Sequence, residues 1–157
     1  MGNRLTMPSS LILTTPEATV ALGGQVAARL APGEAVCLFG PLGAGKSTLA
    51  RGLIRALTTP DEEVPSPTFT LVQAYGARTF DLHHFDLYRL KEAGETEELG
   101  LYEALDAGVA IIEWPERLEG RLPPHRLDIE IILPLDGDTG RAVTLTGVGR
   151  WVMKDQF

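Results

Sequence analysis

The chain has 157 residues, of which 44% are hydrophobic, and its 21 acidic and 14 basic side chains give a formal net charge of −7. This length and apolar content can form one core, so we expect a single domain over residues 1–157, with loose tails at 1–10 and 151–157. The acidic charge argues against a broad nucleic-acid-binding surface, because such a surface must be basic to displace counterions. We therefore expect any contact with RNA to run through a partner protein.

No run of residues approaches a membrane span in length and apolarity, and no charged-then-apolar signal peptide opens the sequence. The single cysteine, Cys37, lies within an apolar run and cannot form a disulfide inside the chain. A reducing compartment suits such a chain, and the expected location is the cytoplasm.

The first expected elements are a short edge strand over Leu11–Leu13 and a helix. Thr14 and Glu17 have the T-x-x-E spacing of a capping box, which predicts the start of that helix. We expect it to end near residues 32–33, where proline and glycine follow one another. The positions that mark its apolar face are Leu22, Val26 and Leu30.

The run Val36–Phe39 is short, continuously apolar and ended by glycine, which predicts a buried strand. The sequence GPLGAGKST that follows matches the phosphate-binding loop G-x-x-x-x-G-K-[ST]. Its glycines allow turns that direct backbone N–H groups at an anion, and the next helix adds its dipole. We expect Lys46 to reach the outer phosphates and Ser47 to bind Mg²⁺. The predicted nucleotide-binding residues of the loop are Gly40, Leu42, Gly43, Ala44, Gly45, Lys46, Ser47 and Thr48.

Helical spacing continues after the loop and predicts that one face of a helix packs on the sheet, through Leu49, Leu53, Ile54 and Leu57. A polar loop over residues 58–66 then leads to a strand, Phe69–Tyr75, which can pair as a hairpin with a second run, Thr79–Asp86. Short helices are expected over Leu90–Asp106, where glycines interrupt the pattern.

The last third of the chain contains a second continuous apolar strand, Val109–Ile112, and two further strands, Leu127–Leu133 and Ala142–Val148. The first of these two alternates, with Leu127, Ile129, Ile131 and Leu133 expected on one face. Two buried strands far apart in the sequence favour an α/β fold with a P-loop NTPase-like, mostly parallel sheet flanked by helices and extended by antiparallel edge strands.

Two acids follow apolar runs, as in the Walker B pattern that places a carboxylate near the magnesium ion. Glu113 ends the second buried strand, and Asp86 ends the run HHFD. With Lys46 they are the candidate catalytic residues, and with Ser47 the candidate metal ligands. The adjacent His83 and His84 cannot both bind one ion, because neighbouring strand residues point to opposite faces, so we interpret them as structural.

The base is expected to be adenine. Guanine recognition uses an N-K-x-D stretch, but the only asparagine is Asn3, and no D-x-x-G occurs. ATP and Mg²⁺ are therefore the expected cofactors.

Four stretches occur in order, GPLGAGKSTLARGL, SPTFTLVQAY, HHFDLYRL and IIEWPERL. Together they resemble the TsaE family (also called YjeE), small bacterial P-loop ATPases, over nearly the whole chain. The resemblance implies a role in making threonylcarbamoyladenosine at position 37 of tRNA that reads codons starting with A. It implies the partners TsaD and TsaB, with tRNA bound only through the complex.

The resemblance also assigns residues. It implies that Ser47, where threonine is usual, and the acids Asp86 and Glu113 serve the magnesium-nucleotide site, and that Arg141 approaches the nucleotide. It further implies a segment comparable to a switch loop and a functional tryptophan, coupled to partners, which fall on Ser66, Pro67, Thr68 and Trp114. One departure is Pro41, which stands where an acidic residue is usual and removes a backbone donor.

Two other functions remain open on the sequence. A small-molecule kinase also needs a phosphate loop and a carboxylate base, although its usual cluster of lid arginines is missing. A nucleotide-dependent adaptor would need no hydrolysis at all. We expect slow hydrolysis by the chain alone and faster hydrolysis with its partners.

Overall fold

The computed structural model describes residues 9–67, 70–133 and 140–154. Within these residues one seven-stranded sheet has the order β1-β7-β6-β2-β5-β4-β3. The strands are β1 (Ser9–Leu13), β2 (Ala35–Phe39), β3 (Val72–Gly76), β4 (Asp81–Asp86), β5 (Gly108–Glu113), β6 (Arg126–Ile132) and β7 (Arg141–Val148). The helices are α1 (Pro16–Ala27), α2 (Lys46–Leu57), α3 (Thr96–Leu99) and α4 (Leu101–Ala107), with 3₁₀ turns η2 (Ala93–Glu95), η3 (Pro115–Leu118) and η4 (Gly149–Met153).

The four central strands, β6, β2, β5 and β4, run parallel, whereas β3 pairs antiparallel with β4, β7 with β6, and β1 with β7. This confirms the predicted mixed α/β fold with antiparallel edges. Strands β2 and β5 are buried almost throughout, because layers cover both faces of the sheet's centre. That double burial is why both strands have continuous apolar runs rather than alternation.

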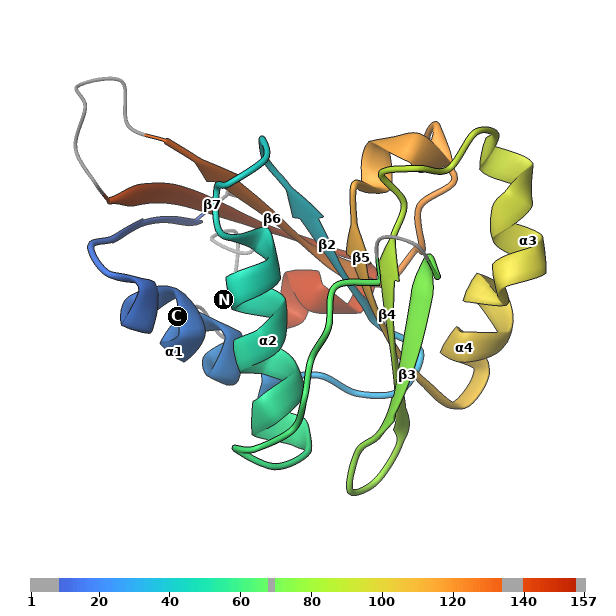
Figure 1. Cartoon of the computed structure of the whole chain (residues 1–157), viewed down its shortest axis with the longest axis horizontal. Coiled ribbons are helices and arrows are strands. Elements are labelled where there is room, and N and C mark those ends of the chain that lie inside the picture. The colour runs from blue at the N-terminus through green and yellow to red at the C-terminus, as the bar shows by residue number, and fades with distance from the viewer. Residues whose placement is uncertain (1–8, 68–69, 134–139, 155–157) are drawn as a thin grey trace.

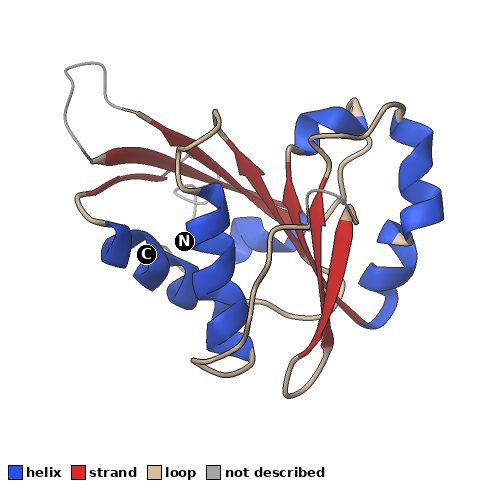
Figure 2. Ribbon diagram, viewed as in Figure 1, coloured by secondary structure: helices blue, strands red, loops and turns tan. Residues whose placement is uncertain are grey.

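Helices α1 and α2 cover one face of the sheet, and α3 and α4 lie on the other (Figures 1 and 2). Successive residues of β2 therefore pack into different hydrophobic cores, one on each face of the sheet. Val36 and Leu38 pack with Leu53 of α2, whereas Cys37 packs with Leu101 of α4. The candidate site residues on β4 and β5 lie on the α2 face.

The backbones of α1 and α2 approach closely at two glycines. A Cβ atom on Gly23 would lie 2.5 Å from the carbonyl oxygen of Leu49, and one on Gly52 would lie 2.6 Å from that of Val20. Neither position tolerates a side chain unless the helices move apart. This contact fixes α2, and with it the residues of its first turn, against the rest of the fold.

Helix α1 has its N-cap one residue later than predicted and ends several residues earlier than predicted. Thr15, not Thr14, is the N-cap, and its hydroxyl oxygen accepts from the backbone N–H of Ala18 at 3.1 Å. Proline at position 16 occupies the first turn, so the residue before it adopts the extended conformation that a cap requires. The helix ends at Ala27, and tighter turn bonds from Arg29 and Leu30 close it before the expected 32–33.

The strand expected over Phe69–Tyr75 is shifted, since β3 begins at Val72 and ends at Gly76. Leu71 has φ 67°, a left-handed conformation that interrupts the extended chain, and Phe69 lies outside the described residues. Leu133, expected on the buried face, lies beyond the end of β6 and is exposed.

Of the expected tails, residues 9–10 and 151–154 belong to the fold, whereas residues 1–8 and 155–157 lie outside the described residues. Ser9 and Ser10 form the start of β1, and Trp151 in η4 is only 4% exposed. Lys154 donates from Nζ to Oε1 of the buried Glu34 at 2.7 Å, which attaches the C-terminal segment to the start of β2. None of the helices in the described part of the chain has the length and apolarity needed to span a bilayer.

Candidate nucleotide site

The glycine-rich loop between β2 and α2 has the backbone that the sequence predicts. Gly40, Gly43 and Gly45 have φ values of 148°, 79° and 113°. At Gly40 a Cβ atom would lie 2.4 Å from the carbonyl oxygen of Ile131, so no side chain fits there. Because α2 begins at Lys46, the free N–H groups of its first turn adjoin the loop, which is the arrangement that binds phosphate.

Lys46 is buried, and its ammonium has two neighbours within the site. Its Nζ donates to the carbonyl oxygen of Gly40 at 2.6 Å and lies 3.4 Å from the ring centroid of Trp114. Burial lowers the pKa of Lys46 below its usual value, and the negative charge of Glu113 opposes that shift. Among the described residues that line the site, the charged groups beside this ammonium are acids.

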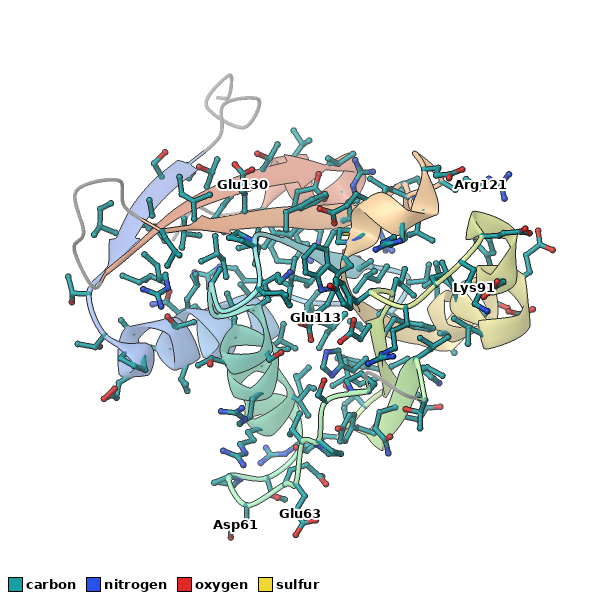
Figure 3. The ribbon with its side chains drawn as sticks, turned by 45° about the horizontal axis from the view of Figure 1, so that its top comes forward. Asp61, Glu63, Lys91, Glu113, Arg121 and Glu130 are labelled. Atoms are coloured by element: carbon teal, nitrogen blue, oxygen red, sulfur yellow. The ribbon has the colours of Figure 1, made fainter. Side chains whose placement is uncertain are left out.

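Asp86 and Glu113 are register partners at the ends of the neighbouring parallel strands β4 and β5. Both carboxyl groups are buried, and Figure 3 shows Glu113 in the interior, whereas Asp61 and Glu63 lie at the periphery. The hydroxyl of Ser47 donates to Oε1 of Glu113 at 3.1 Å. Asp86 accepts from the backbone N–H of Tyr88 at 3.1 Å through Oδ1.

These groups line one cavity of about 290 Å³. Its lining residues are Leu42, Gly43, Gly45, Lys46, Ser47, Thr48, Ser66, Asp86, Glu113 and Trp114. The structure therefore brings together most of the side chains that the sequence nominated from four separate segments. Pro67, which follows Ser66 in the same loop, is buried, and Thr68 lies outside the described residues.

Arg141 contacts the backbone of the phosphate loop. Its Nε donates to the carbonyl oxygen of Ala44 at 2.8 Å, and Nη2 is 3.4 Å from that of Gly43. Arg141 lines a second cavity of about 90 Å³. The other residues around this cavity are Leu13, Thr15, Pro16, Thr19, Ala44 and Thr48. Thr48 borders both cavities, so the two adjoin at the first turn of α2.

A short chain of backbone hydrogen bonds connects the Ser66–Pro67 segment to Asp86. The N–H of Leu71 donates to the carbonyl oxygen of Pro67 at 2.7 Å, and the N–H of Asp86 donates to that of Leu71 at 2.9 Å. A movement of the Ser66–Pro67 segment would therefore shift the backbone of Asp86 through these hydrogen bonds.

Sequence reasoning missed one member of the site. His83 and His84 do point to opposite faces, as expected, but His84 is buried beside Glu113, with Nε2 2.6 Å from Oε2. The available signal was the spacing to Asp86, since residues two apart on a strand share a face. Tyr88 was also missed as a neighbour of the site, and its ring centroid lies 4.9 Å from that of Trp114.

The model of the family described as Threonylcarbamoyl adenosine biosynthesis protein TsaE matches residues 13–141. The chain belongs to the TsaE family. The matched range contains every candidate residue of both cavities, from Leu13 to Arg141.

Several relatives bear the name tRNA threonylcarbamoyladenosine biosynthesis protein TsaE. One from Bacillus subtilis (strain 168) is 39% identical over 135 residues, covering 85% of this chain and 82% of its own. One from Mycobacterium bovis is 34% identical over 144 residues, covering 86% and 85%. A crystal structure of Bacillus subtilis YdiB superposes with a TM-score of 0.71 and 31% identity, over 91% of this chain and 87% of that chain.

Proposed function

We propose that this protein is a magnesium-dependent ATPase that supports the formation of threonylcarbamoyladenosine in tRNA, together with TsaD and TsaB. The observation that carries the proposal is the convergence of Lys46, Ser47, Asp86 and Glu113 in one cavity beneath a glycine-rich loop. Membership of the TsaE family supports the pathway, and the chemistry of the cavity supports the activity.

The oxygen atoms around the cavity suit Mg²⁺, which prefers carboxylate and hydroxyl ligands and keeps several waters. Ser47 and Glu113 would hold the ion, with Asp86 beside them on the next strand. Bound there, the ion would neutralise charge on the outer phosphates. Lys46 would exchange the Gly40 carbonyl for phosphate oxygens, and the N–H groups at the start of α2 would bind the phosphate chain.

The nucleoside is proposed to extend past Thr48 toward the second cavity. Thr48 borders both cavities, and Thr15 and Arg141 offer polar atoms at the far one. This direction keeps the phosphates among the acids and Lys46 and leaves the base on the α1 side of the loop. Adenine is favoured because the chain has no N-K-x-D stretch.

Hydrolysis is proposed to be slow in the isolated chain. Among the described residues, none of those that line the phosphate cavity is an arginine or a glutamine. In other phosphoryl-transfer proteins a supplied arginine raises the rate by roughly 10³–10⁵. A partner that donates such a group would activate the site.

The decisive experiment measures phosphate release from ATP by the purified chain, alone and with TsaD and TsaB. We expect little release alone and a large increase with both partners. Fast release that the partners leave unchanged contradicts partner activation. Release that appears only with an added small-molecule acceptor favours a kinase. Full support of tRNA modification by a variant that binds but cannot hydrolyse ATP favours an adaptor.

A further inference from the structure

The imidazole of His84 and the carboxylate of Glu113 form a buried pair beside the phosphate cavity. His84 is 1% exposed and Glu113 is 2% exposed, and Nε2 lies 2.6 Å from Oε2. The hydroxyl of Ser47 donates to the other carboxylate oxygen, Oε1, at 3.1 Å. Glu113 is therefore held from two sides, by a residue of α2 and by a residue of β4.

The chemistry of the pair fixes the direction of its hydrogen bond. An ionised carboxylate only accepts, so the Nε2 atom of His84 carries the hydrogen. The other ring nitrogen, Nδ1, is buried without a hydrogen-bond partner among the described residues. Burying an unpartnered polar atom is unfavourable, so packing alone favours an apolar side chain at this position. The contact with Glu113 is what a histidine adds.

We propose that His84 is a positioning residue for the magnesium-nucleotide site. Its Nε2–H holds Oε2 of Glu113 and so directs Oε1 toward Ser47, where the proposed ion would bind. The inference rests on the proposed function. Residues that hold a ligand's own hydrogen-bond partners in place tune metal sites strongly, and their loss typically costs roughly 10- to 100-fold in metal affinity or activity.

Two substitutions separate the hydrogen bond from the bulk of the ring. In His84→Gln the side-chain amide can still donate to Oε2 of Glu113, whereas His84→Leu keeps apolar volume and removes the donor. The matched control is His83→Leu. It changes the same residue type one position earlier on β4, where the side chain is half-buried on the opposite face and its ring centroid lies 6.3 Å from that of Phe85.

The experiment measures the affinity of a non-hydrolysable ATP analogue by calorimetry, once with Mg²⁺ and once with EDTA. We expect Mg²⁺ to strengthen binding to the wild-type chain, and His84→Leu to reduce that strengthening by roughly 10- to 100-fold. Binding in EDTA should not change, because within the described part of the chain the hydrogen bond of His84 goes to Glu113 and not to a phosphate-binding group of the loop. His84→Gln should retain most of the Mg²⁺ effect, and His83→Leu all of it.

Each possible result supports or overturns the role of His84. An intact Mg²⁺ effect in His84→Leu overturns the inference but leaves the proposed function standing. Equal losses in the Gln and Leu variants show that ring packing matters and the donor does not, which also overturns it. A wild-type chain that binds no nucleotide refutes the proposed function and the inference with it. If His84→Leu does not fold, His84→Met replaces it as the flexible variant without a donor, with the same expected loss.

Discussion

The ammonium of Lys46 lies 3.4 Å from the centre of the Trp114 ring, while the same group donates to the Gly40 carbonyl at 2.6 Å. Trp114 directly follows Glu113 and has φ 60°, a left-handed conformation that is rare for a non-glycine residue. A cation over a partly desolvated indole ring gains about 1–2 kcal/mol. The phosphates of a nucleotide would compete for this ammonium with both of its neighbours.

We therefore predict that MgATP changes the fluorescence of Trp114. Displacing a cation from the ring alters the electrostatic field around the indole, and the emission should change in intensity or wavelength. The chain has two tryptophans, and Trp151 is buried in the C-terminal segment beside Lys154. In the control variant Trp114→Phe, which leaves only Trp151, the change should disappear. A change that persists in that variant contradicts the prediction.

We expect Lys46 to contribute strongly to nucleotide binding. At about a hundredfold excess over its dissociation constant, a ligand stabilises the folded chain by roughly 2.7 kcal/mol. For a chain of this size, MgATP or MgADP should raise the melting temperature by about 5–10 °C. Lys46→Ala should lose most of this shift, measured against the melting temperature of the same variant without ligand.

Lys91→Ala is the matched control for Lys46→Ala, because Lys91 is exposed and lies far along the chain, after β4. It should show the full ligand-induced shift. No shift in the wild-type chain with saturating MgATP would remove the basis for nucleotide binding.

We expect the two acids, Asp86 and Glu113, to have different roles. Glu113 accepts from Ser47, the proposed metal ligand, whereas the Asp86 backbone is bonded to Leu71 at the end of the Ser66–Pro67 segment. Glu113→Gln should therefore weaken the Mg²⁺-dependent part of ATP binding and lower hydrolysis. Asp86→Asn should largely spare ADP binding and mainly lower turnover in the complex with TsaD and TsaB. Each tenfold loss of rate corresponds to about 1.4 kcal/mol of lost transition-state stabilisation.

Titrating the Asp86 and Glu113 variants with ADP and ATP, with and without Mg²⁺, provides the measurement. Each substitution replaces a carboxylate by an amide of nearly the same shape, so side-chain volume is conserved, while the negative charge and one acceptor oxygen are lost. Identical losses of affinity in all four conditions would show that the two acids do not differ in role.

Arg141, which is expected to approach the nucleotide, also donates hydrogen bonds to the carbonyl oxygens of Ala44 and Gly43 and so braces the phosphate loop. Arg141→Met keeps the aliphatic stem and removes these donors, at a cost of about 1–2 kcal/mol for bonds that solvent partly replaces. Nucleotide affinity should fall both with and without Mg²⁺, unlike the effect of Glu113→Gln. The control Arg78→Met, an exposed position in the β3–β4 turn, should bind normally; equal affinities of the Arg141 and Arg78 variants would contradict the bracing role.

Local sequence was enough to predict β2, β5 and the phosphate loop, because few other local structures are compatible with a short apolar run or with this glycine pattern. It was not enough where the cause is remote. The contact between His84 and Glu113 depends on the pairing of β4 with β5, which brings together residues 29 positions apart. Trp151 is buried by packing in the core that contains Leu22 and Val26, and Lys154 donates to Glu34 from 120 positions away. No periodicity within the last residues of the chain contains that information.

The last prediction uses Cys37, the only cysteine, which is buried in the middle of β2. Burial raises the pKa of its thiol above the usual range, and the nearby charge of Asp128 adds to the shift. An unfolded chain releases this proton near pH 8.5, so above that pH unfolding is favoured by up to about 1.4 kcal/mol per pH unit, and stability should decline. Cys37→Ala should lack this decline in melts between pH 7 and 10.

In the wild-type chain a thiol reagent should label Cys37 only through unfolding, and MgATP at a hundredfold excess should slow labelling by about 100-fold. Lys46→Ala serves as the control, because MgATP should have little effect on labelling in that variant. Rapid labelling of the native chain at a rate that MgATP does not change would contradict the burial of Cys37.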